Sequence, residues 1–168
     1  MERLALLEVV EDTWRQLDAA LSGLDETAMV EPGVVEGWSV KDLLGHVAAW
    51  EQMALRHVDQ WRRGETPGGT GDFSVDAYNA TESTRRRDWP LAKVQAEAAE
   101  TRERLRTTLQ SMADDEWHAV TGEGERRQTL GDWVGGALGG AAGPGTHAVD
   151  HVQHIQAWRG TREHGVGL

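Results

Sequence analysis

Two histidines four residues apart are the feature of this sequence that most directly suggests chemistry. His147 and His151 lie in the segment Gly145-Thr-His-Ala-Val-Asp-His-Val-Gln-His-Ile-Gln-Ala-Trp-Arg159. On an α-helix this spacing puts both imidazoles on one face, one turn apart, where they can share a metal ion. His46, far upstream, lies near the apolar side of another predicted helix. If the two helices pack together, three ring nitrogens converge, and three ligands with an open position are typical of a reactive metal site.

Other residues near these histidines are candidates for supporting roles. Asp150 is a candidate for orienting a ligand imidazole, as carboxylates beside metal sites often do, although a solvated helix acid has the same pattern. His154 is a candidate general base or substitute ligand, and a place at the pocket rim suits it as well. We expect Trp50 and Trp158 to form pocket walls. The simpler alternative for all the histidines is that they are ordinary helix-face residues hydrogen-bonded to neighbours.

Imidazole-only ligation suits a divalent ion such as Zn²⁺, Ni²⁺ or Mn²⁺ and does not choose among them. The chain has no cysteine, which excludes disulfides, a thiolate nucleophile and cysteine-bound zinc. No serine lies in a Gly-x-Ser-x-Gly motif, and the glycine-rich segment 135–145 is not followed by the Gly-Lys-Ser/Thr of a phosphate-binding loop. We interpret that segment as a flexible break beside the site. The metal hypothesis therefore has no competing catalytic motif.

The elements that must position these residues are amphipathic helices. Apolar residues recur at three- and four-residue steps, which predicts four long helices, at about residues 2–21, 39–61, 91–112 and 146–159. Residues 63–89 form a long crossover between the second and third helices, with one short helix, and a weaker start signal at Thr129 predicts another short helix. Residues from Gly160 onward are expected to fray. The predicted fold class is an all-α four-helix bundle.

The second helix has the clearest start. Ser39 and Asp42 have the spacing of a capping box, in which each side chain bonds the backbone of the other residue. At 100° per residue, His46, Trp50, Met53 and His57 follow one flank of its apolar stripe. His57 is expected at the surface or at the edge of the core. Glu51 is expected to be an ordinary exposed acid.

Composition limits the class of protein. With 168 residues the chain is most simply one domain, spanning 1–168. The net charge of −11 argues against nucleic-acid binding, which needs clustered lysine and arginine. No stretch approaches the roughly 20 apolar residues of a membrane span, and acids within the first apolar pattern argue against a signal peptide. We therefore expect a cytoplasmic protein with a small-molecule substrate, no nucleic-acid partner and no membrane.

Two segments, Gly37–Glu51 and His147–Trp158, resemble the DinB/YfiT-like superfamily. That superfamily includes the N-terminal domains of mycothiol-dependent maleylpyruvate isomerases and the ClbS-like proteins. The resemblance implies a four-helix bundle, often a homodimer, with a divalent metal on one histidine of the second helix and two of the last. These positions match His46, His147 and His151. It also implies a low-molecular-weight thiol such as mycothiol or bacillithiol as co-substrate.

Two functions of different classes remain open from the sequence. The first is a metal-dependent S-transferase, isomerase or hydrolase acting on a small electrophile. The second is a ClbS-like protein that binds or sequesters a small molecule without turnover. An inert helical protein that merely dimerises is a third, and it requires that side chains fill the cleft.

Overall fold

Four long helices make up most of the computed structural model, which describes residues 1–69 and 72–165. They are α1 (Arg3–Leu21), α3 (Val40–Arg62), α5 (Leu91–Ser111) and α8 (His147–Gly165). The predicted all-α bundle is confirmed. No helix within the described residues is long and apolar enough to cross a membrane.

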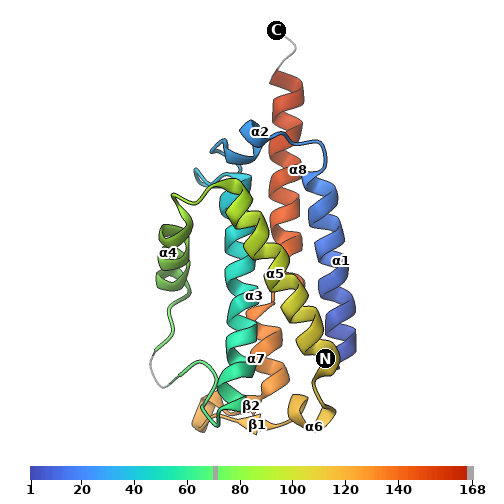
Figure 1. Ribbon diagram of the computed structural model, residues 1–168, viewed down its shortest axis with the longest axis vertical. Coiled ribbons are helices and arrows are strands. Elements are labelled where there is room, and N and C mark those ends of the chain that lie inside the picture. Colours follow the sequence, from blue (N-terminus) through green and yellow to red (C-terminus); the bar gives the residue numbers. More distant parts are fainter. Residues whose placement is uncertain (70–71, 166–168) are drawn as a thin grey trace.

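The bundle contains parallel neighbours because of its crossover (Figure 1). Followed along the sequence colours, α1 and α8 run upward in this view, whereas α3 and α5 run downward. A helix pair of this kind needs a return connection, and residues 63–90 supply it. The short helix α4 (Val75–Arg86) lies within this connection and stands beside α3. The predicted crossover and its single short helix are both present.

Capping boxes fix the starts of two helices. At α3, the Asp42 amide donates to Ser39 Oγ at 3.2 Å, and the Ser39 amide donates to Asp42 Oδ2 at 2.8 Å. The same reciprocal pair joins Thr129 and Asp132 at the start of α7 (Leu130–Ala137). Each pair satisfies amides that have no partner inside the helix. The first box sets where α3 begins and hence where His46 lies.

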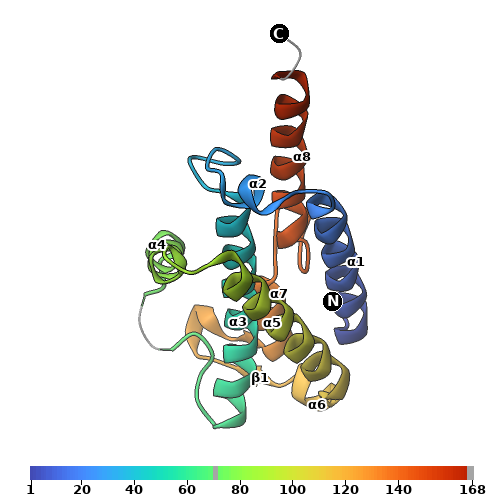
Figure 2. The same ribbon diagram turned by 45° about the horizontal axis from the view of Figure 1, so that its top comes forward.

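The fourth position of the bundle is shared by two helices, with α7 below and α8 above (Figure 2). The glycine-rich segment between them allows the division. Gly145 has φ +82°, and a Cβ there would lie 3.0 Å from both Leu6 and Val9 of α1. Both the backbone angle and the close approach favour glycine at this position.

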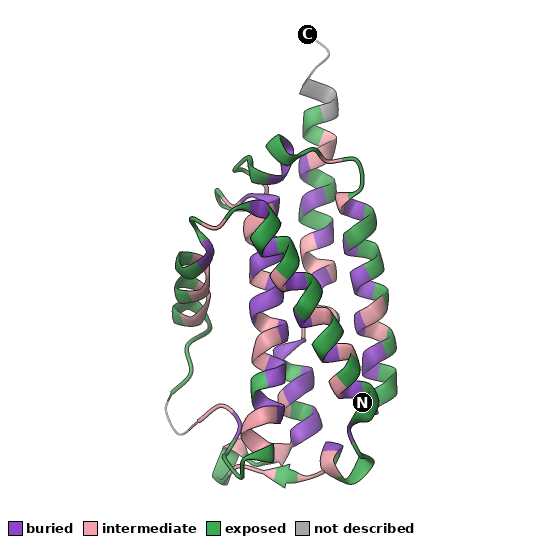
Figure 3. Cartoon of the chain, viewed as in Figure 1, coloured by how far each residue is buried: buried purple, intermediate pink, exposed green. Residues whose placement is uncertain are grey.

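The core has two clusters, one at each end of the bundle. The lower cluster joins α1, α3, α5 and α7, and includes Leu6, Leu105 and Val134. The upper cluster joins the other ends of α1, α3 and α5 to α8, and includes Leu17 and Ile155. Buried residues accordingly line the inward faces of the long helices, while their outer faces are exposed (Figure 3). The glycine-rich segment lies where the two clusters meet along the chain.

Some elements differ from the sequence prediction. Short helices α2 (Glu26–Val30) and α6 (Asp114–Trp117), and a 3₁₀ turn (Gly124–Arg126), occupy segments predicted to be loops. Residues Val120–Thr121 (β1) and Gln128–Thr129 (β2) pair as a small antiparallel ladder. The predicted fraying from Gly160 is wrong, since α8 continues to Gly165. The helix is held there because Arg159 donates to the Ala20 carbonyl at 2.7 Å and Arg162 pairs with Glu31.

Candidate metal centre

The three predicted ligands meet in one place. The Nε2 atoms of His46 and His147 are 3.0 Å apart, and those of His151 and His147 are 3.2 Å apart. One ligand atom from each residue lies within 4.8 Å of the others. Imidazole nitrogens bound at about 2.0–2.1 Å to neighbouring positions of one tetrahedral or octahedral ion are themselves about 2.8–3.4 Å apart. The donor set and the two spacings about His147 therefore fit a divalent ion.

Two helix starts bring these rings together. His46 lies in the second turn of α3, behind its capping box. His147 is the first residue of α8, and its amide donates to the Leu138 carbonyl at 3.2 Å, which ties the start of α8 to the end of α7. His151 follows one turn later on the same face.

Burial keeps the three imidazoles neutral. It lowers the pKa of His147 to about 3, with the charge of His151 as a second cause. It lowers the pKa of His46 to about 3 and that of His151 to about 4, where neighbouring histidines add to the effect. Metal binding requires unprotonated imidazole, so protons do not compete for these nitrogens near neutral pH.

Asp150 is hydrogen-bonded to the glycine-rich segment that precedes α8. Its Oδ2 accepts from the Ala141 amide at 2.9 Å. A Cβ added to Gly140 would lie 2.5 Å from the same oxygen and 2.8 Å from the Thr146 carbonyl oxygen. Asp150 therefore fastens the glycine-rich segment to α8, and its predicted role of orienting an imidazole stays a prediction.

The two predicted pocket tryptophans lie in different surroundings. Trp50 lies beside the histidines, with its ring centroid 6.0 Å from that of His147, and its Nε1 donates to Asn79 Oδ1 at 3.0 Å. Trp158 instead packs in the upper core cluster and is 9% exposed. The seven-residue spacing from His151 keeps Trp158 on the same helix face but moves it about 10 Å along the axis. Trp38, which the site prediction left out, is edge-on to His46 at 5.2 Å.

His154 is exposed at the border of the site, with its ring 5.8 Å from that of His151. This position leaves it able to exchange protons with solvent. Its proposed part as a general base remains a prediction.

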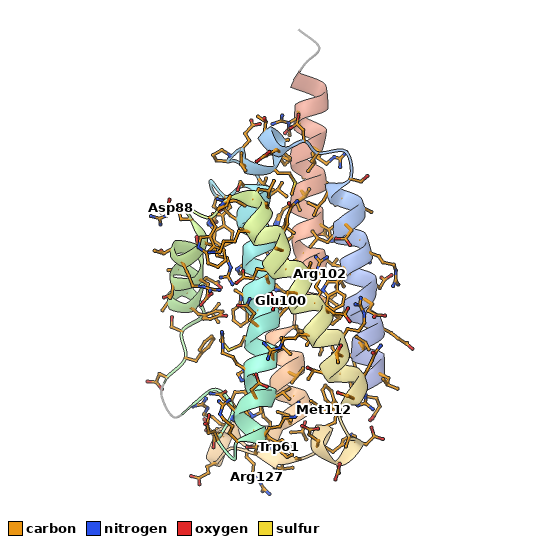
Figure 4. The ribbon with its side chains drawn as sticks, in the orientation of Figure 1. Trp61, Asp88, Glu100, Arg102, Met112 and Arg127 are labelled. Atoms are coloured by element: carbon orange, nitrogen blue, oxygen red, sulfur yellow. The ribbon has the colours of Figure 1, made fainter. Side chains whose placement is uncertain are left out.

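Glu51 is buried, contrary to expectation. Its side chain accepts from Trp14 Nε1 at 2.6 Å, and the residue is 4% exposed. Burial raises its pKa to about 7, against the opposing effects of Arg102 and the Trp14 hydrogen bond. Arg102 belongs to α5 (Figure 4), and its charge acts on the Glu51 carboxyl. The signal for burial was present in the sequence, because Glu51 lies four residues after Val47 and three before Ala54 in the apolar stripe.

Two cavities adjoin the centre. A small one of about 10 Å³, close to the size of one water molecule, is lined by both Glu51 and His147. A larger one of about 470 Å³ lies further along α3, and Trp50 forms part of its wall. None of the three histidines lines the larger cavity.

The sequence matches the family model of the DinB superfamily over residues 10–139. The chain belongs to the DinB superfamily. The matched part contains His46 and ends before α8, so it does not contain His147 or His151. No protein with a curated description matches the sequence.

Several solved structures share the DinB fold at low sequence identity. An uncharacterised protein from Escherichia coli UTI89 superposes with a TM-score of 0.76 at 12% identity, covering 96% of this chain and 95% of that one. The colibactin self-resistance protein ClbS, in complex with double-stranded DNA, gives 0.72 at 15% identity, with 94% and 95% covered. A mycothiol-dependent maleylpyruvate isomerase gives 0.68 at 16% identity. The match covers 92% of this chain and 61% of the isomerase.

The ClbS complex corrects one expectation. The net charge of the chain predicted that it has no nucleic-acid partner. That prediction is wrong, since a DinB-fold protein has been solved bound to duplex DNA. Net charge sums over the whole surface, whereas a binding face depends only on the charges that meet the phosphates.

Proposed function

We propose that this chain is a divalent-metal-dependent enzyme that uses a low-molecular-weight thiol to act on a small electrophile. The observation that carries the proposal is the convergence of three Nε2 atoms, at 3.0 and 3.2 Å about His147. The likeness to a mycothiol-dependent maleylpyruvate isomerase supports the thiol, and so does the presence of a substrate-sized cavity beside the centre.

His46, His147 and His151 would hold a divalent ion, because α3 and α8 carry them on facing sides. The ion would supply Lewis acidity that lowers the pKa of a bound thiol or water. Trp38 and Trp50 flank the imidazoles and restrict water.

In a transfer reaction the S–C bond forms as the bond to the leaving group breaks. In an isomerisation the thiol adds reversibly to a conjugated double bond, and it is eliminated after rotation about the resulting single bond. In both cases we assign His154, which is exposed beside His151, the role of receiving the thiol proton.

Metal analysis tests the proposal. We expect tag-free protein to contain about one divalent ion per chain, and His147→Ala to contain none. His154→Ala is the matched control, since it removes a histidine of the same helix outside the converging trio, and it should keep the ion. Wild-type protein that is purified without an affinity tag, and that neither contains nor takes up Zn²⁺, Ni²⁺ or Mn²⁺, would contradict the proposal.

A second candidate is a protein that binds and protects against a small molecule without turnover. The aromatic wall of the larger cavity and the fold shared with a self-resistance protein favour it. Mass spectrometry after incubation with an electrophile and mycothiol or bacillithiol separates the two candidates. An enzyme yields the thiol adduct or isomer, whereas a binding protein returns its ligand unmodified. The expected homodimer and cytoplasmic location belong to the same proposal, and light scattering on the purified protein tests the dimer.

A further inference from the structure

Two residues that line the larger cavity have buried polar atoms that take no part in the metal centre. They are Nδ1 of His57, from α3, and Nε1 of Trp133, from α7. Within residues 1–69 and 72–165 neither atom has a hydrogen-bond partner. His57 is 6% exposed, so water is largely withheld from its ring. Buried polar groups are normally satisfied, so two unsatisfied nitrogens on residues that line one cavity point to a ligand that satisfies both.

The pair offers one donor and one acceptor side by side. An indole Nε1–H can only donate. Burial lowers the pKa of His57 to about 4, and a hydrogen bond with Gln60 opposes the shift. A neutral imidazole has one donor nitrogen and one acceptor nitrogen, so Nδ1 can present a lone pair. The two ring centroids are 5.3 Å apart. A hydroxyl group can accept a hydrogen bond from an indole and donate one to an imidazole at the same time.

Flat aromatic side chains form part of the cavity wall. Trp50 and Phe73 line the cavity with ring centroids 6.1 Å apart, nearly perpendicular to one another. Gly68 lies directly against Trp133, since a Cβ there would be 2.8 Å from the indole. A volume of about 470 Å³ falls within the usual range of small-molecule sites, roughly 300–1,000 Å³.

The charged lining favours an anion. Arg56 and Arg126 both line the cavity, and each lies over an aromatic ring, Tyr78 and Trp133 respectively. The acid in the lining, Asp132, already accepts two hydrogen bonds from Thr129 in the capping box. Arg56 is exposed and His57 is buried, so Arg56 lies nearer the mouth of the cavity than His57 does.

We propose that this cavity binds a flat aromatic carboxylate that carries a hydroxyl group, with the hydroxyl between His57 and Trp133 and the carboxylate toward Arg56 and Arg126. The assignment is of a bound ligand rather than of the electrophile, and it goes beyond the proposed function. The binding itself does not involve the metal, because the three ligand histidines do not line the cavity.

Calorimetry with three naphthalene probes tests the assignment. We expect 6-hydroxy-2-naphthoate to bind wild-type protein about fivefold more tightly than 2-naphthoate, which lacks the hydroxyl, the effect of one buried hydrogen bond. It should also bind more tightly than 2-naphthol, which lacks the carboxylate. In Trp133→Phe the ratio between the first two probes should fall toward one, whatever the change in absolute affinity, because the hydroxyl then keeps only its bond to His57. Trp61→Phe, which removes an indole outside the cavity lining, is the control and should preserve the ratio.

Failure of 6-hydroxy-2-naphthoate to bind at millimolar concentration, or an unchanged ratio in Trp133→Phe, overturns the assignment. Repeating the titration on His147→Ala separates it from the metal hypothesis. Equal binding by a protein without metal supports the cavity even if the enzyme proposal fails. If protein that contains the metal binds none of the three probes, the metal proposal stands and the cavity assignment is refuted.

Discussion

Replacing Glu51 with glutamine should change how the stability of the metal-free protein depends on pH. Glutamine has nearly the same shape and can still accept the hydrogen bond that Trp14 donates to Glu51 at 2.6 Å. The main difference is that glutamine cannot ionise. Any pH-dependent difference in the free energy of unfolding between the two proteins therefore reports on the Glu51 carboxyl group.

The size and sign follow from the raised pKa. Burial raises the pKa of Glu51 from 4.5 to about 7, a difference of 2.5 units, and one unit corresponds to about 1.36 kcal/mol. The full effect is then about 3.4 kcal/mol as an upper estimate. Below pH 4.5 both folded and unfolded wild-type chains hold the proton. As pH rises from 4.5 to 7 the unfolded chain loses it first, so wild-type stability falls relative to Glu51→Gln.

Urea unfolding in the presence of a chelator, at half-unit steps from pH 4.5 to 8, measures the effect. Buried histidines also titrate in this range, but they are common to both proteins and cancel in the difference at each pH. We expect Glu51→Gln to gain about 3 kcal/mol on wild type across the range. Glu100→Gln, which removes an equal charge from an exposed position of α5 (Figure 4), should change by less than about 0.5 kcal/mol. A difference for Glu51→Gln that stays constant or falls with rising pH would refute the reasoning.

Two further substitutions test the surroundings of α8 and α4, and each is compared with a control substitution at a nearby residue. Gly140→Ala places a methyl group against the Asp150 carboxylate, so we expect at least tenfold weaker metal binding in a competition titration, whereas Gly136→Ala, with no atom within 4 Å, should leave it unchanged. Arg86 bonds Glu97 and Glu82 between α4 and the bundle with its side chain 5% exposed, so Arg86→Ala should lower the free energy of unfolding by about 3 kcal/mol. Arg85→Ala, at 43% exposed, should lower it by less than about 1 kcal/mol, and equal losses in the two arginine variants would contradict the argument.

Features that depend on local sequence were predictable. The capping box at Ser39 defined where α3, which carries His46, begins, and the one at Thr129 defined the start of α7. The apolar periodicity located the other long helices. Once α3 and α8 are placed as facing helices, the one-turn spacing of His147 and His151 leaves few ways for them to avoid His46.

Features that depend on what packs against a residue were not predictable in the same way. The side chain of Glu51 is polar, which predicted exposure, but its position belongs to the apolar stripe of α3. Its position and not its residue type decided its burial. His57 was expected at the surface or core edge, yet α7 and the segment around Gly68 cover it. Trp158 shares a helix face with His151, but periodicity gives the angle of a side chain and not which neighbours it meets along the axis. The extension of α8 depends on Arg159 and Arg162 reaching the α1–α2 connection, which no local pattern reveals.

Because α7 and α8 share the fourth position of the bundle, they can unfold separately. His147 and His151 belong to α8, which is joined to α7 through the glycine-rich segment, whereas His46 belongs to α3. An ion at the centre would therefore cross-link α3 and α8. Metal binding and the packing of α8 against the bundle would then be thermodynamically coupled. Chelation should then speed amide hydrogen exchange in α8 before it does so in α7.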